Sequence, residues 1–256
     1  MLVDSHCHID FPELAGQLDS VFSLMRENQV ERALCVSVTL EDFPRVRKLA
    51  ESYPQVHASV GVHPDYEAVA PVSVGELVAL ASHPRIVAIG ETGLDYYRLK
   101  GDLEWQRERF RTHIRAAREC GKPLIIHTRE AAEDTLRIMR EEGADKAGGV
   151  MHCFTESMEV AKVAMDLGFY ISFSGIVTFK NAKTIKEVAT QVPLAKMLVE
   201  TDSPYLAPVP YRGKTNQPGY VKHVAEEIAR LQGVDFEKVC KETTDNFFQL
   251  FKAITR

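Results

Sequence analysis

The chain has 256 residues, of which 45% are hydrophobic and 26% are charged, with a formal net charge of -5 and an isoelectric point near 6.0. This composition is typical of a globular protein with a sizeable core, and it excludes a globally basic nucleic-acid-binding protein. A nucleic-acid substrate would therefore have to be met by a local basic patch or by metal ions, because phosphates must be neutralised.

The sequence shows no sign of membrane insertion or secretion. No run approaches the roughly 20 apolar residues that span a bilayer, and the N-terminus lacks the basic and apolar regions of a signal peptide. The five cysteines are scattered, with no CxxC or zinc-finger spacing. Such cysteines are typical of reduced thiols, so we expect a cytoplasmic protein.

Eight short apolar or β-branched runs recur along the chain and predict strands. They cover residues 2–8, 32–38, 56–62, 85–91, 123–128, 148–153, 169–174 and 196–201. Amphipathic segments lie between them; in residues 107–120, for example, Phe110 and Ile114 fall at helical spacing. Two more helical patterns, at 219–233 and 235–251, follow the last run.

Eight strands that alternate with helices predict an α/β fold, a (β/α)8 TIM barrel, as a single domain over residues 1–256. A doubly wound open sheet is the main alternative, but it usually has fewer strands and a Gly-rich first turn. No GxGxxG or Walker motif follows any predicted strand, which favours the barrel.

The first predicted strand carries two histidines, His6 and His8, in the stretch VDSHCHID. Alternate residues of a strand face the same side, so the two imidazoles point together from backbones about 7 Å apart. Neutral imidazole is a common ligand of divalent metal ions. The pair predicts a metal site, although a histidine-rich terminus or a tag remnant would leave the same pattern.

More histidines and two carboxylates stand where the active site of such a barrel lies, at the C-terminal ends of the strands. Four imidazoles and two carboxylates are too many for one tetrahedral zinc and fit a centre of two divalent metal ions. The predicted ligands are His6, His8, Glu91, His127, His152 and Asp202.

Each predicted ligand has a structural alternative. A lone buried histidine, such as His127 or His152, is more often a hydrogen-bonded core residue. Glu91 and Asp202 could instead cap helices that follow them. Glu200 lies two residues before Asp202 and so would face the same side of a strand. We expect it to be a buried structural carboxylate. The other histidines lie away from the strand ends and are expected on the surface or in packing: His57, His83, His113 and His223.

Further residues near the predicted ligands could bind substrate. Arg129 could grip a phosphate or carboxylate with its planar guanidinium, or simply pair with Glu130 or Glu133. His63 could donate to a substrate oxygen or hold a loop. Rim residues could stack bases or attract an anion, or serve only packing and solvation: Tyr96, Tyr97, Phe154, Arg212 and Lys214.

Seven stretches resemble the motifs of one known family: DSHCHID, GVHP, GETGLDYY, IIHTREA, HCFT, GFYISFSGI and VETDSPYLAPVP. In this order they resemble the TatD family of metal-dependent deoxyribonucleases, most closely its YcfH-type bacterial branch. The resemblance runs from residue 4 to about residue 218 and implies an amidohydrolase-like TIM barrel with phosphodiesterase activity on DNA. It implies the same six ligands, with Glu91 bridging two ions where related enzymes carry a carbamylated lysine.

The sequence therefore predicts a metal-dependent hydrolase that cleaves DNA phosphodiester bonds, as an exonuclease on single strands or ends. The expected cofactors are two divalent ions, Mg or Mn for activity, with Zn or similar ions possible as bound. Asp202 and Glu91 are the expected catalytic residues, with Asp202 accepting a proton from water; His63 and Arg129 are expected to bind substrate.

Two other functions remain open. One is an amidohydrolase or esterase, such as a D-aminoacyl-tRNA deacylase or a small-molecule hydrolase, since members of the family have been linked to removing D-amino acids from tRNA. The other is a metal-binding or scaffold protein with a vestigial site. We expect DNA as the partner, no membrane association and no obligate protein partner.

Overall fold

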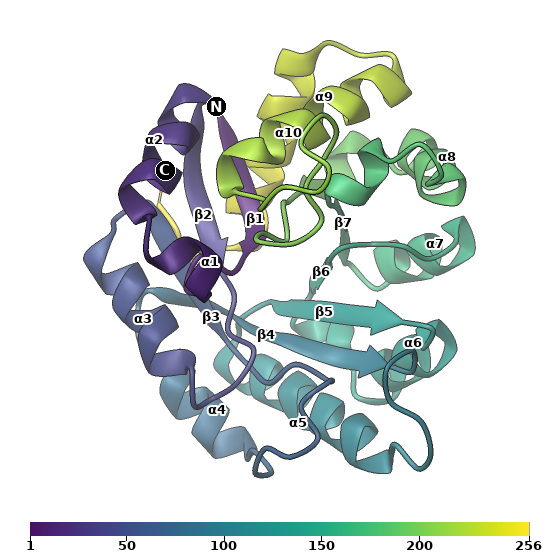
Figure 1. Cartoon of the computed structure of the whole chain (residues 1–256). Helices are drawn as coiled ribbons and strands as arrows, with labels where there is room; N and C mark the ends of the chain where they lie inside the picture. The colour runs from purple at the N-terminus through teal and green to yellow at the C-terminus, as the bar shows by residue number, and fades with distance from the viewer. Residues whose placement is uncertain (256) are drawn as a thin grey trace.

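Eight parallel strands form one sheet, in the order β1 to β8, in the computed structural model, which describes residues 1–255. The strands are β1 (Leu2–Cys7), β2 (Val30–Cys35), β3 (Val56–Val60), β4 (Ile86–Asp95), β5 (Leu124–Arg129), β6 (Gly149–Met151), β7 (Tyr170–Phe173) and β8 (Met197–Val199). The chain winds around the barrel once, with helices outside the strands (Figure 1). The predicted fold is confirmed; Arg256, the last residue of the predicted domain, lies outside the described residues.

The seam between β1 and β8 is joined just beyond the end of β8. The backbone N–H of Asp202 donates to the oxygen of His6 at 2.9 Å, and the N–H of His8 donates to the oxygen of Ser203 at 2.8 Å. These bonds bring the ends of the first and last strands together. Two predicted ligands, His6 and Asp202, are therefore adjacent although they are far apart in sequence.

The helices cover the outside of the barrel. They are α1 (Pro12–Ala15), α2 (Leu18–Glu27), α3 (Phe43–Ser52), α4 (Val74–Ala81), α5 (Glu104–Cys120), α6 (Ala132–Glu141), α7 (Met158–Asp166), α8 (Lys183–Gln191), α9 (Val221–Gln232) and α10 (Phe236–Leu250). Short 3-10 helices are η1 (Ala144–Lys146), η2 (Gly175–Thr178), η3 (Leu194–Lys196) and η4 (Pro218–Tyr220). Within the described residues, none of these helices is long and apolar enough to cross a membrane.

The strands are buried on both faces, as expected of a parallel barrel. On β5, Leu124 and Ile126 belong to the hydrophobic cluster that packs under the outer helices. Ile125, between them, belongs to a second hydrophobic cluster. That second cluster includes Phe247 of α10 and Phe251, which directly follows the helix, together with residues of the strands. Helix α10 therefore closes the N-terminal end of the barrel and leaves the C-terminal end for the site.

Strand β4 differs from the prediction, because Glu91 lies inside it rather than at its end. The strand continues to Asp95 after a register shift between Ile89 and Thr92. At the shift, Gly90 has φ +147, and a Cβ atom there would lie 2.7 Å from the backbone oxygen of Ile125. Only glycine fits this close approach, so the motif GETGLD is needed to bend the strand that carries Glu91.

A buried histidine of α5 predicts an acid-sensitive fold. His113 accepts from the Val62 N–H at 3.0 Å through Nε2 and donates to the Arg109 oxygen at 2.8 Å through Nδ1. Burial lowers the pKa of His113 to about 4. The unfolded chain binds a proton below about pH 6.5 and the folded chain only near pH 4, so stability must fall as the pH falls through this window.

We expect wild type to lose about 2 kcal/mol more free energy of unfolding between pH 7 and pH 5 than His113→Gln. Chemical denaturation at both pH values measures this difference. His223→Gln, on the outer helix α9, is the matched control and should follow wild type. Equal losses in wild type and His113→Gln would show that His113 does not stay neutral in the folded protein.

Candidate metal centre

A cavity of about 810 Å³ opens among the loops that follow the strands. Seven of the eight predicted site residues line it: His8, His63, Glu91, His127, Arg129, His152 and Asp202. The eighth, His6, is fully buried beside them, with its ring stacked on that of His152 at a centroid distance of 3.9 Å. The structure thus brings all the predicted site residues to one end of the barrel.

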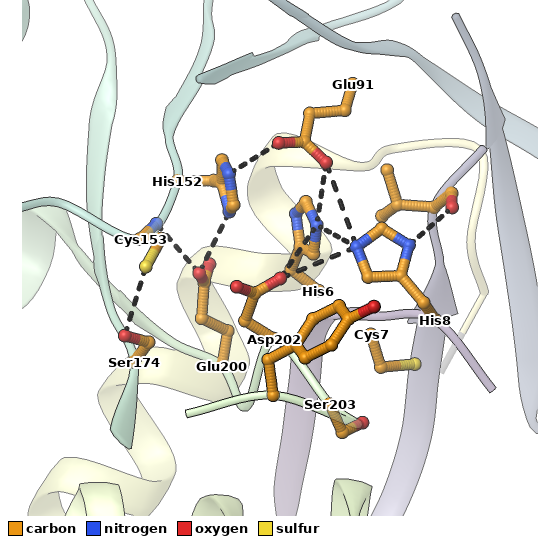
Figure 2. A network of polar contacts seen from close by, with 12 residues as sticks. His6, Cys7, His8, Glu91, His152, Cys153, Ser174, Glu200, Asp202 and Ser203 are labelled. Atoms are coloured by element: carbon orange, nitrogen blue, oxygen red, sulfur yellow. Dashed lines mark hydrogen bonds and ion pairs between the residues drawn. The ribbon is translucent and has the colours of Figure 1, made fainter. Parts of the chain in front are cut away.

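Glu91 lies at the centre of the cluster, as Figure 2 shows for several of its neighbours. Its Oε2 atom lies 3.3 Å from His6 Nε2 and 3.8 Å from His8 Nε2. Its Oε1 atom lies 2.8 Å from His152 Nε2, 3.2 Å from His127 Nδ1 and 3.3 Å from His63 Nε2. The two oxygens therefore face two different groups of imidazoles, so that this one carboxylate could hold a cation with either group.

Asp202 completes the side of the cluster that faces β1 (Figure 2). Its Oδ1 atom lies 3.5 Å from His8 Nε2 and 3.6 Å from His6 Nε2. The Asp202 side chain is 17% exposed, whereas that of Glu91 is 3% exposed. Of these two carboxylates, Asp202 is therefore the one more open to the cavity.

The donor atoms are spaced as ligands of metal ions are. His6 Nε2 and His8 Nε2 lie 3.2 Å apart, close to the separation of about 3.3 Å between two nitrogens bound tetrahedrally to one ion. Among the described residues, three overlapping groups have ligand atoms within 4.8 Å of one another: His6, His152 and Asp202; His6, His8 and Glu91; and His63, Glu91 and His127. The residues present fit a metal centre.

Neighbouring groups fix which imidazole nitrogen faces the cluster. His8 Nδ1 donates to the Val36 backbone oxygen at 2.9 Å, which leaves the Nε2 lone pair free. His152 Nδ1 donates to Glu200 Oε1 at 3.1 Å, so its Nε2 atom is also left as an acceptor. Such partners hold metal-binding histidines in one tautomer and orientation.

His152 shows most clearly that a positive group belongs in the cluster. Its Nε2 atom is buried and forms no hydrogen bond with the described residues, although it lies 2.8 Å from Glu91 Oε1. A nitrogen lone pair and a carboxylate oxygen at this distance repel each other unless a proton or a metal cation joins them. A bound cation would remove this repulsion.

The charges of the cluster compensate one another. Burial opposes ionisation of Glu91, but His152, His63 and His6 outweigh it and hold the pKa of Glu91 well below its usual range. Burial likewise opposes the charge of Asp202, but the neighbouring imidazoles of His8, His6 and His152 lower its pKa. Both carboxylates are therefore anionic, as metal ligands must be.

Two carboxylates beyond the predicted set support the cluster. Glu200 is completely buried, as expected of a structural carboxylate, and also accepts from the Cys153 N–H at 2.7 Å. Asp95, at the end of β4, accepts from His127 Nε2 at 3.1 Å through Oδ2. Sequence reasoning missed Asp95, because β4 was expected to end at Glu91; the conspicuous GLD of GETGLDYY was the available signal.

Asp95→Asn should weaken metal binding by about 10- to 100-fold, the usual effect of losing a partner that orients a metal-binding histidine. Burial opposes the charge of Asp95, but the hydrogen bonds from His127 and the backbone lower its pKa to about 2. Asparagine keeps the shape but loses the charge that orients His127. Calorimetric metal titration measures the change, and Asp134→Asn, on α6, is the control. Equal metal affinities of wild type and Asp95→Asn would show that His127 needs no orientation by Asp95.

The structure decides several of the alternatives raised by the sequence. Glu91 lies within β4, and no helix begins directly after Asp202 in the described chain, so neither residue is a helix cap. His127 and His152 face the cavity rather than the outer helices. Arg129 stacks on Tyr97, with its guanidinium carbon 3.8 Å from the ring centroid, and forms no ion pair with Glu130 or Glu133 in the described chain.

The other rim candidates separate into exposed and packed residues. Tyr97 is 51% exposed, whereas Phe154 is buried and packs edge-on against Phe173. The Tyr96 hydroxyl donates to Asp134 at 2.6 Å. Arg212 stacks over Phe179 and Lys214 over Tyr211, and neither cation lines the cavity.

Comparisons with known proteins point to one family. A family model described as TatD related DNase matches residues 3–252. The Escherichia coli (strain K12) protein described as uncharacterized metal-dependent hydrolase YcfH is 49% identical over 253 residues, covering 98% of this chain and 95% of that protein. The Salmonella typhimurium protein named 3'-5' ssDNA/RNA exonuclease TatD is 31% identical over 259 residues, covering 99% and 100%.

A solved structure shares the whole fold. The crystal structure of YJJV, a TatD homologue from Escherichia coli K12, matches with a TM-score of 0.91 and 29% identity over 98% of each chain. Sequence and structure thus agree along nearly the full length. The chain therefore belongs to the TatD-related DNase family and is a metal-dependent hydrolase.

Proposed function

We propose that this hydrolase cleaves phosphodiester bonds of DNA, as an exonuclease on single strands or strand ends. The observation that carries the proposal is the convergence of four imidazoles on Glu91 and Asp202 in a cavity that also holds Arg129. Metal donors beside a guanidinium that stacks on Tyr97 and forms no ion pair with the described residues suit an anionic phosphodiester. The relative named a 3'-5' ssDNA/RNA exonuclease supports the same substrate class.

The proposed cofactors are two divalent ions, held by His6, His8, Glu91, His127, His152 and Asp202. The two oxygens of Glu91 face different imidazole groups, and this supports two positions rather than one. When bound, such ions lower the pKa of a water molecule and neutralise charge on the phosphoryl group. Carboxylate oxygens suit Mg or Mn for activity, whereas the four imidazoles also suit Zn.

Asp202 is the proposed general base. It is ionised, it is the more exposed of the two central carboxylates, and its Oδ1 atom lies among the donors rather than in the core. A carboxylate in this position can accept the proton that water loses when it attacks phosphorus. Glu91, almost fully buried, would hold the donor groups together and is the second candidate acceptor.

His63 is proposed to contact the substrate as a hydrogen-bond donor. Its Nδ1 atom accepts from the Asp65 backbone N–H at 3.1 Å, so a neutral ring carries its proton on Nε2. That Nε2 atom points toward Glu91 and lines the cavity. A substrate oxygen that enters the cavity can therefore accept from His63.

Arg129→Ala should lower kcat/KM for DNA, because it removes about 2–4 kcal/mol of transition-state stabilisation. The metal content should stay the same. Arg129 lines the cavity and its guanidinium is pre-oriented by Tyr97, so it can neutralise charge on a phosphate. Steady-state kinetics and metal analysis measure both effects. Arg137→Ala, which changes an arginine on the outer helix α6, is the control. If Arg129→Ala has the same kinetics as wild type, Arg129 is only a surface residue stacked on Tyr97.

A substrate panel tests the proposed function. Single-stranded DNA, a series of DNA 3′ ends, D-aminoacyl-tRNA, and lactone or amide substrates should each be assayed with and without chelator. We expect DNA hydrolysis that chelator abolishes and that Mg or Mn restores. Hydrolysis of only the aminoacyl ester, lactone or amide would establish the amidohydrolase or esterase alternative, and no hydrolysis of any substrate would favour a vestigial site.

A further inference from the structure

Three residues of the candidate site each begin a tight turn that ends in an aromatic residue. In every case the aromatic residue lies three positions later, and its backbone N–H donates to the backbone oxygen of the site residue. The three bonds are Phe11 to His8 at 3.1 Å, Tyr66 to His63 at 3.3 Å, and Tyr205 to Asp202 at 3.0 Å. The same local geometry, repeated after β1, β3 and β8, places three aromatic rings on the wall of the cavity.

These rim aromatics (Phe11, Tyr66 and Tyr205) are packed against the site itself. The Phe11 ring stacks on His8 with centroids 4.8 Å apart and an interplanar angle of 21°. Tyr66 meets His63 edge-to-face at 6.1 Å, and Tyr205 meets Phe11 edge-to-face at 6.2 Å. A flat group that stacks on Phe11 would therefore lie one ring layer away from the metal donor His8.

The rim aromatics are held in place but are not covered. Tyr66 is 39% exposed and Tyr205 is 52% exposed. The backbone oxygen of Tyr66 accepts from Arg109 at 2.7 Å, and that of Tyr205 accepts from Asn216 at 2.6 Å. Exposed aromatic faces on an anchored backbone are pre-organised for binding, because little conformational freedom remains to be lost.

An arginine shares the cavity wall with the two tyrosines. Tyr66, Tyr205 and Arg98 all line the cavity, and Arg98 pairs with Asp65 at 3.1 Å. Aromatic faces with an arginine beside them match a base and its flanking phosphate.

We propose that the rim aromatics stack an unpaired terminal nucleobase, the one next to the phosphodiester at the metal donors, and thereby select single-stranded ends. The inference rests on the proposed function, because that function places the phosphate. Every nucleobase offers a π face, so this contact tolerates any sequence. A base inside a duplex is already stacked and paired, and must first be extruded at a cost in free energy, so intact duplex ends are disfavoured.

Kinetics on oligonucleotides test the stacking. Tyr205→Ala should raise KM for single-stranded DNA about tenfold or more, with a smaller change in kcat, whereas Tyr205→Phe keeps the ring and should retain the KM. An abasic terminal nucleotide should raise the wild-type KM similarly. The KM of Tyr205→Ala for the abasic substrate should be no higher than its KM for the normal substrate, because both changes remove the same contact. Tyr66→Ala and Tyr66→Phe form a second pair, and melting temperatures confirm that each variant is folded.

Binding separates this inference from the proposed function. Metal-loaded protein is mixed with single-stranded DNA that carries 2-aminopurine at either its 3′ or its 5′ end, next to a non-hydrolysable methylphosphonate linkage. Quenching by wild type and Tyr205→Phe, but not by Tyr205→Ala, supports stacking even if no DNA is cleaved in the activity assay. DNA cleavage with one KM for normal and abasic ends, and no quenching, would overturn the stacking while the proposed function stands. Neither cleavage nor quenching would overturn both.

Discussion

Asp202→Asn should lower the rate of DNA hydrolysis by about 100-fold or more while the protein stays folded. Asparagine keeps the shape and one ligating oxygen of Asp202 but cannot accept a proton from water. The backbone at Asp202 has φ +56, a conformation that asparagine tolerates well, so the turn should survive. Nuclease rate, metal stoichiometry and melting temperature, measured on one preparation, separate a catalytic loss from an architectural one.

Asp166→Asn, at the end of α7, is the matched control, because it makes the same chemical change on the exposed surface. It should match wild type in all three measurements. Asp202→Asn with full activity and normal metal content would contradict the general-base role. The proton acceptor would then have to be sought first at Glu91.

Glu91→Gln should remove most of the bound metal and lower activity on the order of 1000-fold, because metal ions contribute several kcal/mol to such reactions. The variant replaces one of two oxygens that face separate imidazole groups with an amide nitrogen, which cannot ligate a cation. Metal analysis after dialysis and single-turnover hydrolysis measure the two effects.

Glu156→Gln is the control for Glu91→Gln, since Glu156 is half-buried and near His127 but lies outside the donor groups. We expect it to keep wild-type metal content. If Glu91→Gln also retains its full complement of metal, Glu91 does not bridge ions and serves only to hold the imidazoles in place.

The barrel could be predicted because its strands carry a simple signal. A parallel strand buried on both faces is a continuous apolar run, and all eight predicted runs overlap the observed strands. The prediction was wrong on where β4 ends. Gly90 and Gly93, both at positive φ, let the strand bend and continue to Asp95, and a side chain at Gly93 would collide with the His127 backbone oxygen. Apolar periodicity does not reveal such a contact.

Proximity in the site was predictable, whereas the orienting contacts were not. Histidines and carboxylates near the C-terminal ends of barrel strands must lie close together, so the predicted residues converge. The bonds from His127 to Asp95 and from His152 to Glu200 depend on rotamers and register, which sequence spacing leaves open. The aromatic turns at Phe11, Tyr66 and Tyr205 also depend on backbone hydrogen bonds. The roles of the individual ligands stay predictions.

Diffraction from crystals grown with zinc, recorded above and below the zinc absorption edge, tests the central claim most directly. We expect two anomalous peaks, one on either side of Glu91, with ligating atoms of His6, His8, His127, His152 and Asp202 at about 2.0–2.3 Å. Peaks elsewhere on the barrel, or no peak at Glu91 in crystals of a preparation with metal-dependent activity, would contradict it.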